Sequence, residues 1–211
     1  MVEDTLAQIA KEVAVCTKCQ LHTSRKKAVS GEGPAHAEIM FIGEGPGFHE
    51  NEQGCPFVGA AGKFLDNLLE QAGVTRSDVW IGNVVKCRPP ENRDPLPEEL
   101  SACNDFLDRQ IDAINPSIIV TLGRFSMGKF MPGAKISQVH GEMRKVGNRY
   151  VIAMFHPAAA LHQAALKPAI LADFAKLPEL LKEARAGLGK SAPLPKTKEI
   201  PTEEPKQLNL F

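Results

Sequence analysis

The sequence predicts the α/β fold class: a single domain with a central, mostly parallel, four-stranded sheet and helices on both of its faces. Two observations carry this prediction. Four short apolar runs alternate along the chain with segments whose apolar residues recur at helical spacing, which is the pattern of strands joined by crossover helices. The 211 residues also suffice for one well-formed core, whereas two full domains would be cramped.

Each element is predicted from its own pattern. Short, unbroken apolar runs predict strands over residues 38–42, 78–85, 117–122 and 150–154. Apolar residues at helical spacing predict helices over residues 5–15, 60–72, 97–114, 124–130 and 168–186. Pro97 opens one of these helices at its first turn, and Asn115-Pro116 ends it.

The composition changes after Gly187. Residues 187–207 are rich in Pro, Lys, Glu and Gly and contain almost no apolar side chains, which is typical of a disordered linker. We therefore expect a folded domain over residues 1–187 and a disordered tail over residues 188–211.

Charge and hydropathy exclude several classes of protein. The 25 basic and 25 acidic residues give a net charge of zero, so any binding to nucleic acid must come from a local basic surface. No stretch approaches the roughly 18–20 apolar residues of a membrane span, and no signal peptide is evident. We expect a cytoplasmic, monomeric protein, in which five cysteines are unlikely to form a disulfide framework.

The cysteines suggest a metal site. Cys16 and Cys19 form a C-x-x-C pair, and Cys87 and Cys103 lie far downstream, on either side of a proline-rich loop. Four thiolates that converge in space can hold an iron–sulfur cluster or a tetrahedral zinc ion. In the ordinary alternative, only the C-x-x-C pair matters and the other cysteines are core residues. Cys55 is the odd one out, and an unligated thiol is its simplest interpretation.

Several residues that could carry chemistry follow the predicted strands. GEGPG, at residues 43–47, follows the first strand, Asn83 follows the second and His156 follows the fourth. Phe57 lies in GCPFVGAAG, a loop too rich in glycine and proline to be simple core. Each alone has a structural reading: a glycine turn, a turn-forming Asn, a structural His and a hydrophobic plug. Ligands bind beyond the carboxyl ends of the strands in open α/β sheets, so their coincidence predicts one site.

The motifs taken together resemble the family-four, iron–sulfur uracil-DNA glycosylases. The segments are GEGPG (43–47), GCPFVGAAG (54–62), NVVKCRPP (83–90) and HPAAAL (156–161). The resemblance spans about residues 10–185 and keeps the order and spacing of the motifs. It implies a uracil-DNA glycosylase-like fold.

The resemblance also implies a cofactor. It assigns a four-iron, four-sulfur (4Fe-4S) cluster to the four cysteines Cys16, Cys19, Cys87 and Cys103, and it leaves Cys55 outside the family pattern.

The implied activity is hydrolysis of the N-glycosidic bond of uracil in single- or double-stranded DNA, which leaves an abasic site for base excision repair. A base in a duplex must be flipped out before this bond can be reached. Phe57 would then stack on the uracil, the Asn83 amide would pair with its N3–H and O4, and His156 would stabilise negative charge at O2. Cytosine presents the opposite pattern at both atoms read by Asn83, which would reject it.

The loop of Glu44, Gly45, Pro46 and Gly47 is expected to contact the uracil as well. In the best-known glycosylase branch an aspartate stands at the position of Gly45. Glu44 is therefore the expected catalytic carboxylate, which would orient water or stabilise the sugar cation. Glu50 is the second candidate.

Contacts to the rest of the DNA are also expected. Leu161 is the predicted wedge that fills the gap left by the flipped base. Phosphate-binding charge is available in Lys86, Arg88, Arg93 and Lys167, although each also fits a solvated surface charge.

The last five residues, QLNLF, resemble the bacterial sliding-clamp-binding consensus. Leu208, Leu210 and Phe211 would fill apolar pockets, Gln207 would be a polar anchor, and the linker would give reach. A frayed terminus with a chance match is the ordinary alternative.

Two other functions compete with excision. The main rival is a non-catalytic iron–sulfur DNA-binding or electron-transfer protein, in which the uracil-pocket residues would have no role. The second is a zinc-stabilised nucleic-acid module.

Overall fold

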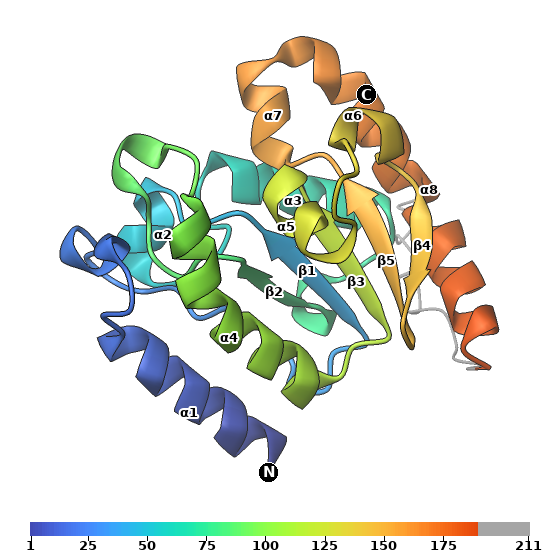
Figure 1. Cartoon of the computed structure of the whole chain (residues 1–211). Coiled ribbons are helices and arrows are strands. Elements are labelled where there is room, and N and C mark those ends of the chain that lie inside the picture. Colours follow the sequence, from blue (N-terminus) through green and yellow to red (C-terminus); the bar gives the residue numbers. More distant parts are fainter. Residues whose placement is uncertain (190–211) are drawn as a thin grey trace, which may run out of the picture.

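The computed structural model describes residues 1–189 and contains a five-stranded sheet with the strand order β2-β1-β3-β5-β4. The strands are β1 (Ile39–Gly43), β2 (Trp80–Asn83), β3 (Ile118–Leu122), β4 (Met143–Val146) and β5 (Arg149–Met154). The first three and β5 run parallel, and β4 pairs with β5 in the antiparallel direction. Figure 1 shows the twisted sheet at the centre of the fold.

The α/β class and the mostly parallel sheet are confirmed, but the predicted number of four strands is wrong. The missed strand, β4, has the sequence MRKV and is largely exposed at the edge of the sheet. Such a strand carries charged residues and lacks the buried apolar run by which the other four were predicted.

The helices are α1 (Val2–Val15), α2 (Phe48–Gln53), α3 (Ala60–Gln71), α4 (Pro97–Ile114), α5 (Arg124–Phe130), α6 (Ile136–Val139), α7 (Pro157–His162) and α8 (Lys167–Gly187). Short 3₁₀ turns lie at η1 (Gln20–Thr23), η2 (Arg76–Asp78), η3 (Pro90–Asn92) and η4 (Ala164–Leu166). All five predicted helices are present within one to three residues at each end. The short helices α2, α6 and α7 were not predicted.

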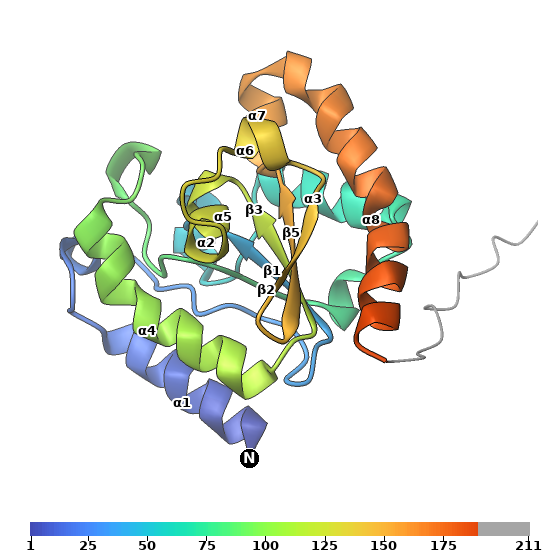
Figure 2. The same ribbon diagram turned by 45° about the vertical axis from the view of Figure 1, so that its right-hand side comes forward.

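Helices cover both faces of the sheet, as expected. One core is formed by α3, α7 and α8 against Phe41, Ile118 and Val120. The other is formed by α4, α5 and α6 against Met40, Ile42 and neighbouring strand residues. Helix α1 lies alongside α4 in both views, on the outer side of that layer (Figures 1 and 2).

A third, smaller apolar cluster joins α1 and α4 to the segment after β2. Its members are Ile9, Val13, Leu21, Val85, Cys87, Cys103 and Phe106. This cluster therefore contains two of the predicted metal ligands.

No helix within residues 1–189 is both long and apolar enough to cross a membrane. The predicted domain boundary at residue 187 stays a prediction. Most of the predicted tail over residues 188–211, namely residues 190–211, lies outside the described residues.

Candidate active site

A cleft of about 290 Å³ lies at the carboxyl edge of the sheet, where the loops after β1, β2 and β5 meet. It brings together all seven residues predicted to contact uracil: Glu44, Gly45, Pro46, Gly47, Phe57, Asn83 and His156. The convergence follows from the parallel strands, because their carboxyl ends lie on one edge.

Phe57 and His156 form one wall of the cleft. Their rings are stacked, with centroids 5.5 Å apart and an interplanar angle of 26°. Phe57 has a φ of 53°, a left-handed conformation that is uncommon for a bulky residue. Gly62 makes this possible, because a Cβ there would lie only 1.8 Å from the Phe57 main-chain oxygen. The glycine-rich loop thus holds an aromatic face in a strained position, which is common at ligand sites.

Asn83 ends β2 with its side chain only 1% exposed. Its Oδ1 is buried and accepts no hydrogen bond from any residue in the described part of the chain. An unsatisfied buried acceptor costs about 1–3 kcal/mol, so this oxygen is suited to a donor on a ligand. Gly43 leaves the space, since a Cβ there would come within 2.5 Å of Oδ1.

His156 caps the N-terminus of α7. Its Nδ1 accepts a hydrogen bond of 3.1 Å from the main-chain N–H of Ala158. This contact places the ring proton on Nε2, which leaves Nε2–H as a donor. Burial lowers the pKa of His156 to about 4, although the charge of Glu50 opposes the shift. The imidazole is therefore neutral at neutral pH.

Glu44 lines the same cleft. Burial, with a contribution from the charge of Asp94, raises the pKa of this carboxyl to about 7, while Arg124 acts in the opposite direction. The strand-like pairing of the loop continues past β1, because Val85 N–H donates to the Glu44 main-chain oxygen at 3.1 Å. A carboxyl in this environment can change its protonation near neutral pH.

Glu50 ties the two pocket loops together. Its Oε1 accepts from the main-chain N–H groups of Val58 and Gly59, each at 2.8 Å, and its Oε2 accepts from Gly47 N–H at 3.1 Å. Three main-chain donors occupy this buried carboxylate. Its contacts favour a positioning role over activation of water, which leaves Glu44 as the better candidate for that task.

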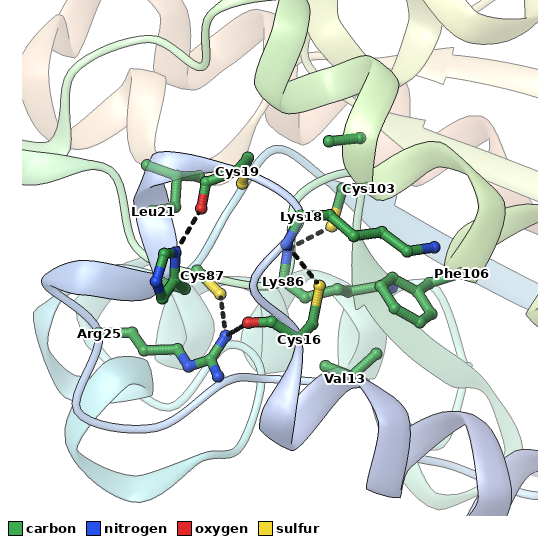
Figure 3. A pocket seen from close by; sticks show the side chains of 12 residues that line it. Val13, Cys16, Lys18, Cys19, Leu21, Arg25, Lys86, Cys87, Cys103 and Phe106 are labelled. Atoms are coloured by element: carbon green, nitrogen blue, oxygen red, sulfur yellow. Dashed lines mark hydrogen bonds between the residues drawn. The ribbon is translucent and has the colours of Figure 1, made fainter.

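A second cavity is lined by the four cysteines predicted to bind a metal: Cys16, Cys19, Cys87 and Cys103 (Figure 3). Three of the sulfur atoms accept hydrogen bonds: Cys16 from Lys18 N–H (3.4 Å), Cys87 from Arg25 Nη1 (3.4 Å) and Cys103 from Lys86 N–H (3.3 Å). Donors of this kind stabilise thiolates.

The two inner cysteines, Cys87 and Cys103, are buried. Burial raises the pKa of Cys87, against the effect of Arg25, and burial raises the pKa of Cys103 to about 11. Each also feels the charge of neighbouring cysteines, which reflects their convergence. Within residues 1–189, no three His, Cys, Asp or Glu side chains gather closely enough to hold a single metal ion.

The comparisons with known proteins agree with this arrangement. The model of the uracil DNA glycosylase superfamily matches residues 30–181. A type-4 uracil-DNA glycosylase of Archaeoglobus fulgidus is 45% identical over 186 residues, which cover 84% of this chain and 94% of the relative. Those of Sulfurisphaera tokodaii and Thermotoga maritima are 47% and 43% identical, over 84% and 86% of this chain and 85% and 97% of their own lengths. The chain belongs to the type-4 uracil-DNA glycosylases.

Sequence analysis predicted four basic residues of this type-4 glycosylase as phosphate contacts. For Lys86 the prediction is wrong. Its side chain is 1% exposed and hydrogen-bonded inside the protein. Burial lowers its pKa to about 8, although Cys103 opposes the shift. Arg93 lines the cleft but is held by Glu99 at 2.6 and 2.9 Å. Arg88 lies over the ring of Phe48, and Lys167 lies over the ring of Phe64.

The predicted wedge, Leu161, lies on α7 and is 52% exposed, while its neighbour Ala160 is buried in the core. An exposed large apolar side chain beside the cleft is compatible with insertion into DNA.

Sequence analysis missed several residues of the two sites. Asn92 and His162 line the cleft at the sheet edge, and Arg25 lines the cysteine cavity. Asn92 has a left-handed φ of 56° within the loop between two cysteines, and His162 directly follows the HPAAAL motif. The only feature of the sequence that could have pointed to these residues is their position beside the motifs.

Proposed function

We propose that this protein hydrolyses the N-glycosidic bond between uracil and deoxyribose in DNA and leaves an abasic site for base excision repair. The observation that carries the proposal is that one cleft holds two complementary groups: the buried acceptor Asn83 Oδ1, which has no partner within residues 1–189, and the donor Nε2–H of His156. These are an acceptor and a donor of the kind that the edge of a uracil ring requires.

Recognition follows from these groups. The flipped base slides between the loops and stacks on the aromatic ring of Phe57. Asn83 Oδ1 accepts from uracil N3–H, and the amide nitrogen donates to O4. Cytosine carries an acceptor at the first position and a donor at the second. It would leave buried groups unpaired, at a cost of about 1–3 kcal/mol each.

Catalysis rests on stabilising the leaving uracil as an anion. As the glycosidic bond breaks, negative charge develops on O2, and His156 Nε2–H donates to it. A neutral imidazole does this without losing its proton, and the bond to Ala158 N–H fixes the orientation of the ring. Main-chain N–H groups of the loop over residues 43–47 would add to the stabilisation.

Glu44 completes the reaction on the sugar side. As a carboxylate it stabilises the positive charge that develops on the sugar and orients the attacking water. Gly45, which replaces the aspartate of the best-known branch, leaves this task to its neighbour. A Cβ at Gly45 would lie 2.7 Å from Val85 Cγ2, so the packing opposes a larger residue there.

The role of Glu44 predicts a pH dependence. Its pKa is about 7, and only the ionised form can act, so the single-turnover rate should rise between about pH 6 and pH 8 and then level off. His156 remains neutral throughout this range, since its pKa is about 4. The Glu44→Gln variant should be slow and lose this rise. A rate in Glu44→Gln that still climbs through pH 7 would assign the dependence to another group.

The four cysteines are proposed to hold a 4Fe-4S cluster. The donor set fits this group, because four thiols surround one cavity and N–H groups point at three sulfurs. When bound, the cluster would cross-link the N-terminal segment, the loop after β2 and α4.

DNA contacts outside the base pocket are proposed for the exposed groups at the rim. Leu161 would enter the gap in the base stack, and Arg88 and Lys167 would contact phosphates. Arg88 also lies over the ring of the exposed Phe48, with 5.4 Å to the ring centre.

The direct test is incubation with an oligonucleotide that contains one uracil, followed by alkaline cleavage of abasic sites. Cleavage at the uracil position, and none with cytosine or thymine in its place, is expected. If the iron-containing protein bound the oligonucleotide but released no uracil, the result would favour the rival hypothesis of a non-catalytic iron–sulfur DNA-binding protein.

We also propose that the C-terminal peptide binds the bacterial sliding clamp through Gln207, Leu208, Leu210 and Phe211. These residues lie outside the described part of the chain, so the proposal rests on the sequence motif alone. Deleting residues 207–211 should abolish binding to the cognate clamp in a surface-immobilised assay and leave excision on short oligonucleotides unchanged. Equal clamp affinity of the full and truncated chains would contradict it.

A further inference from the structure

Lys86 is the one fully buried lysine among residues 1–189, at 1% exposure, and it lies between the two sites. Its Nζ donates to the main-chain oxygen of Asn83 at 3.0 Å and to Gln110 Oε1 at 2.7 Å. It also lies 5.7 Å from the centre of the Trp80 ring. Lysine is almost never fully buried unless it is paired, because an ammonium is costly to remove from water.

The side of Lys86 away from Asn83 faces the cysteine cavity, which this residue lines. No carboxylate in the described part of the chain forms an ion pair with Lys86; the lysine ion pairs involve other residues. Lys86 lines the cysteine cavity, and the Cys103 sulfur accepts from its main-chain N–H at 3.3 Å (Figure 3). Four thiolates give an assembled cluster net negative charge, which would stabilise a buried cation beside it.

On the other side, the same ammonium holds the backbone that carries Asn83. The Asn83 Oδ1 and the Phe57 ring both lie beside Gly43, where an added Cβ would come within 2.5 and 2.7 Å of them. A small shift of its main chain would move Oδ1 away from a bound uracil. Misplacement of a recognition group by a fraction of an ångström is enough to slow catalysis.

We propose that Lys86 is a positioning residue that couples the two sites: its ammonium is the buried counter-charge of the cysteine thiolates and fixes the backbone of Asn83 for reading uracil. The inference rests on the proposed excision activity and cluster, and it explains why the same short segment, Asn83–Cys87, serves both.

The first arm of the test concerns the cluster. Lys86→Met keeps the length of the side chain and removes its charge, and Lys129→Met is the matched control at an ion-paired lysine on α5. Both proteins are purified under the same conditions, and loss of the visible absorbance of the cluster is followed after a chelator is added. Lys86→Met should release iron several times faster than the unmodified protein. Lys129→Met should release it at the unmodified rate. Equal release from Lys86→Met would overturn the counter-charge role.

The second arm is a double-mutant cycle in single-turnover excision, on protein matched for iron content. Lys86→Met alone should be slower by roughly tenfold to a hundredfold, the equivalent of one lost buried hydrogen bond. If Lys86 acts through Asn83, adding Lys86→Met to Asn83→Ala should cost little more. If Lys86→Met slowed excision by the same factor in the unmodified protein and in Asn83→Ala, Lys86 would not act through Asn83, and the proposed coupling would be wrong.

A second variant guards against misfolding of Lys86→Met. Gln110→Met leaves the charge of Lys86 in place and removes one acceptor of its ammonium. It should slow excision less than Lys86→Met does, and it should add little to the effect of Asn83→Ala. Additivity with Asn83→Ala would again overturn the proposal. An unmodified protein that neither carries iron nor excises uracil would contradict the proposed function itself, before any variant is measured.

Discussion

Replacing His156 by alanine is expected to slow single-turnover excision of uracil about a hundredfold to a thousandfold, because one preorganised donor to a developing anion contributes roughly 3–4 kcal/mol. Asn83→Ala should be comparably slow. The His156 side chain donates from Nε2 while Ala158 N–H occupies Nδ1, so no neighbouring group can replace it in the same position. The measurement is rapid-quench excision at enzyme excess, with thermal unfolding of each variant in parallel.

The control for this prediction is His36→Ala. His36 is exposed, its nearest acid is Glu3 at 3.8 Å, and it precedes β1 at the opposite edge of the sheet from the cleft. It should excise uracil at the unmodified rate. If His156→Ala and Asn83→Ala both kept near-normal rates while remaining folded, the active-site assignment would be wrong.

The unfolding data carry separate information about Asn83. Its Oδ1 is a buried acceptor without a partner, so the folded protein already bears a cost there. Asn83→Ala removes that cost and should lower stability much less than a typical buried substitution. A group that costs stability and is needed for activity is the pattern expected at a binding site.

The placement of the site could be predicted from the sequence because it depends on topology. Once the strands are assigned to one parallel sheet, their carboxyl ends lie on the same edge, and GEGPG, Asn83 and His156 lie on that edge with them. The strand at the edge could not be found in the same way, because Met143–Val146 is held by main-chain pairing with β5 and carries no buried apolar pattern.

Burial of charged groups was the part that the sequence could not reveal. Lys86 stands beside Cys87 and Arg88 and reads as one of several basic surface residues. Its burial depends on Gln110, which is distant in the sequence and whose amide is itself fixed by Ser30 at 2.9 and 3.1 Å. The three main-chain donors to Glu50 are likewise set by how two loops pack.

The cysteine site joins parts of the chain that are distant in the sequence. Cys16 and Cys19 follow α1, Cys87 follows β2, and Cys103 lies on α4. These parts are held together by the contacts between α1 and α4 and by a small apolar cluster. Arg25 also donates hydrogen bonds to the main-chain oxygens of Cys16 and Ala14. A bound cluster would therefore contribute to folding directly, as structural metals do in other small sites, where binding is worth about 10–16 kcal/mol.

Cys87→Ser is accordingly expected to lose most of its iron and to fall sharply in soluble yield. The net stability of a domain is about 5–15 kcal/mol, so loss of a structural metal can remove all of it. Iron per protein, visible absorbance and soluble yield are the measurements. Cys55→Ser is the matched control, because Cys55 lies outside the cysteine cavity and should keep iron and yield. Full iron content in Cys87→Ser would show that the ligand set is different, whereas an iron-free but soluble and active Cys87→Ser would show that the fold does not depend on the cluster.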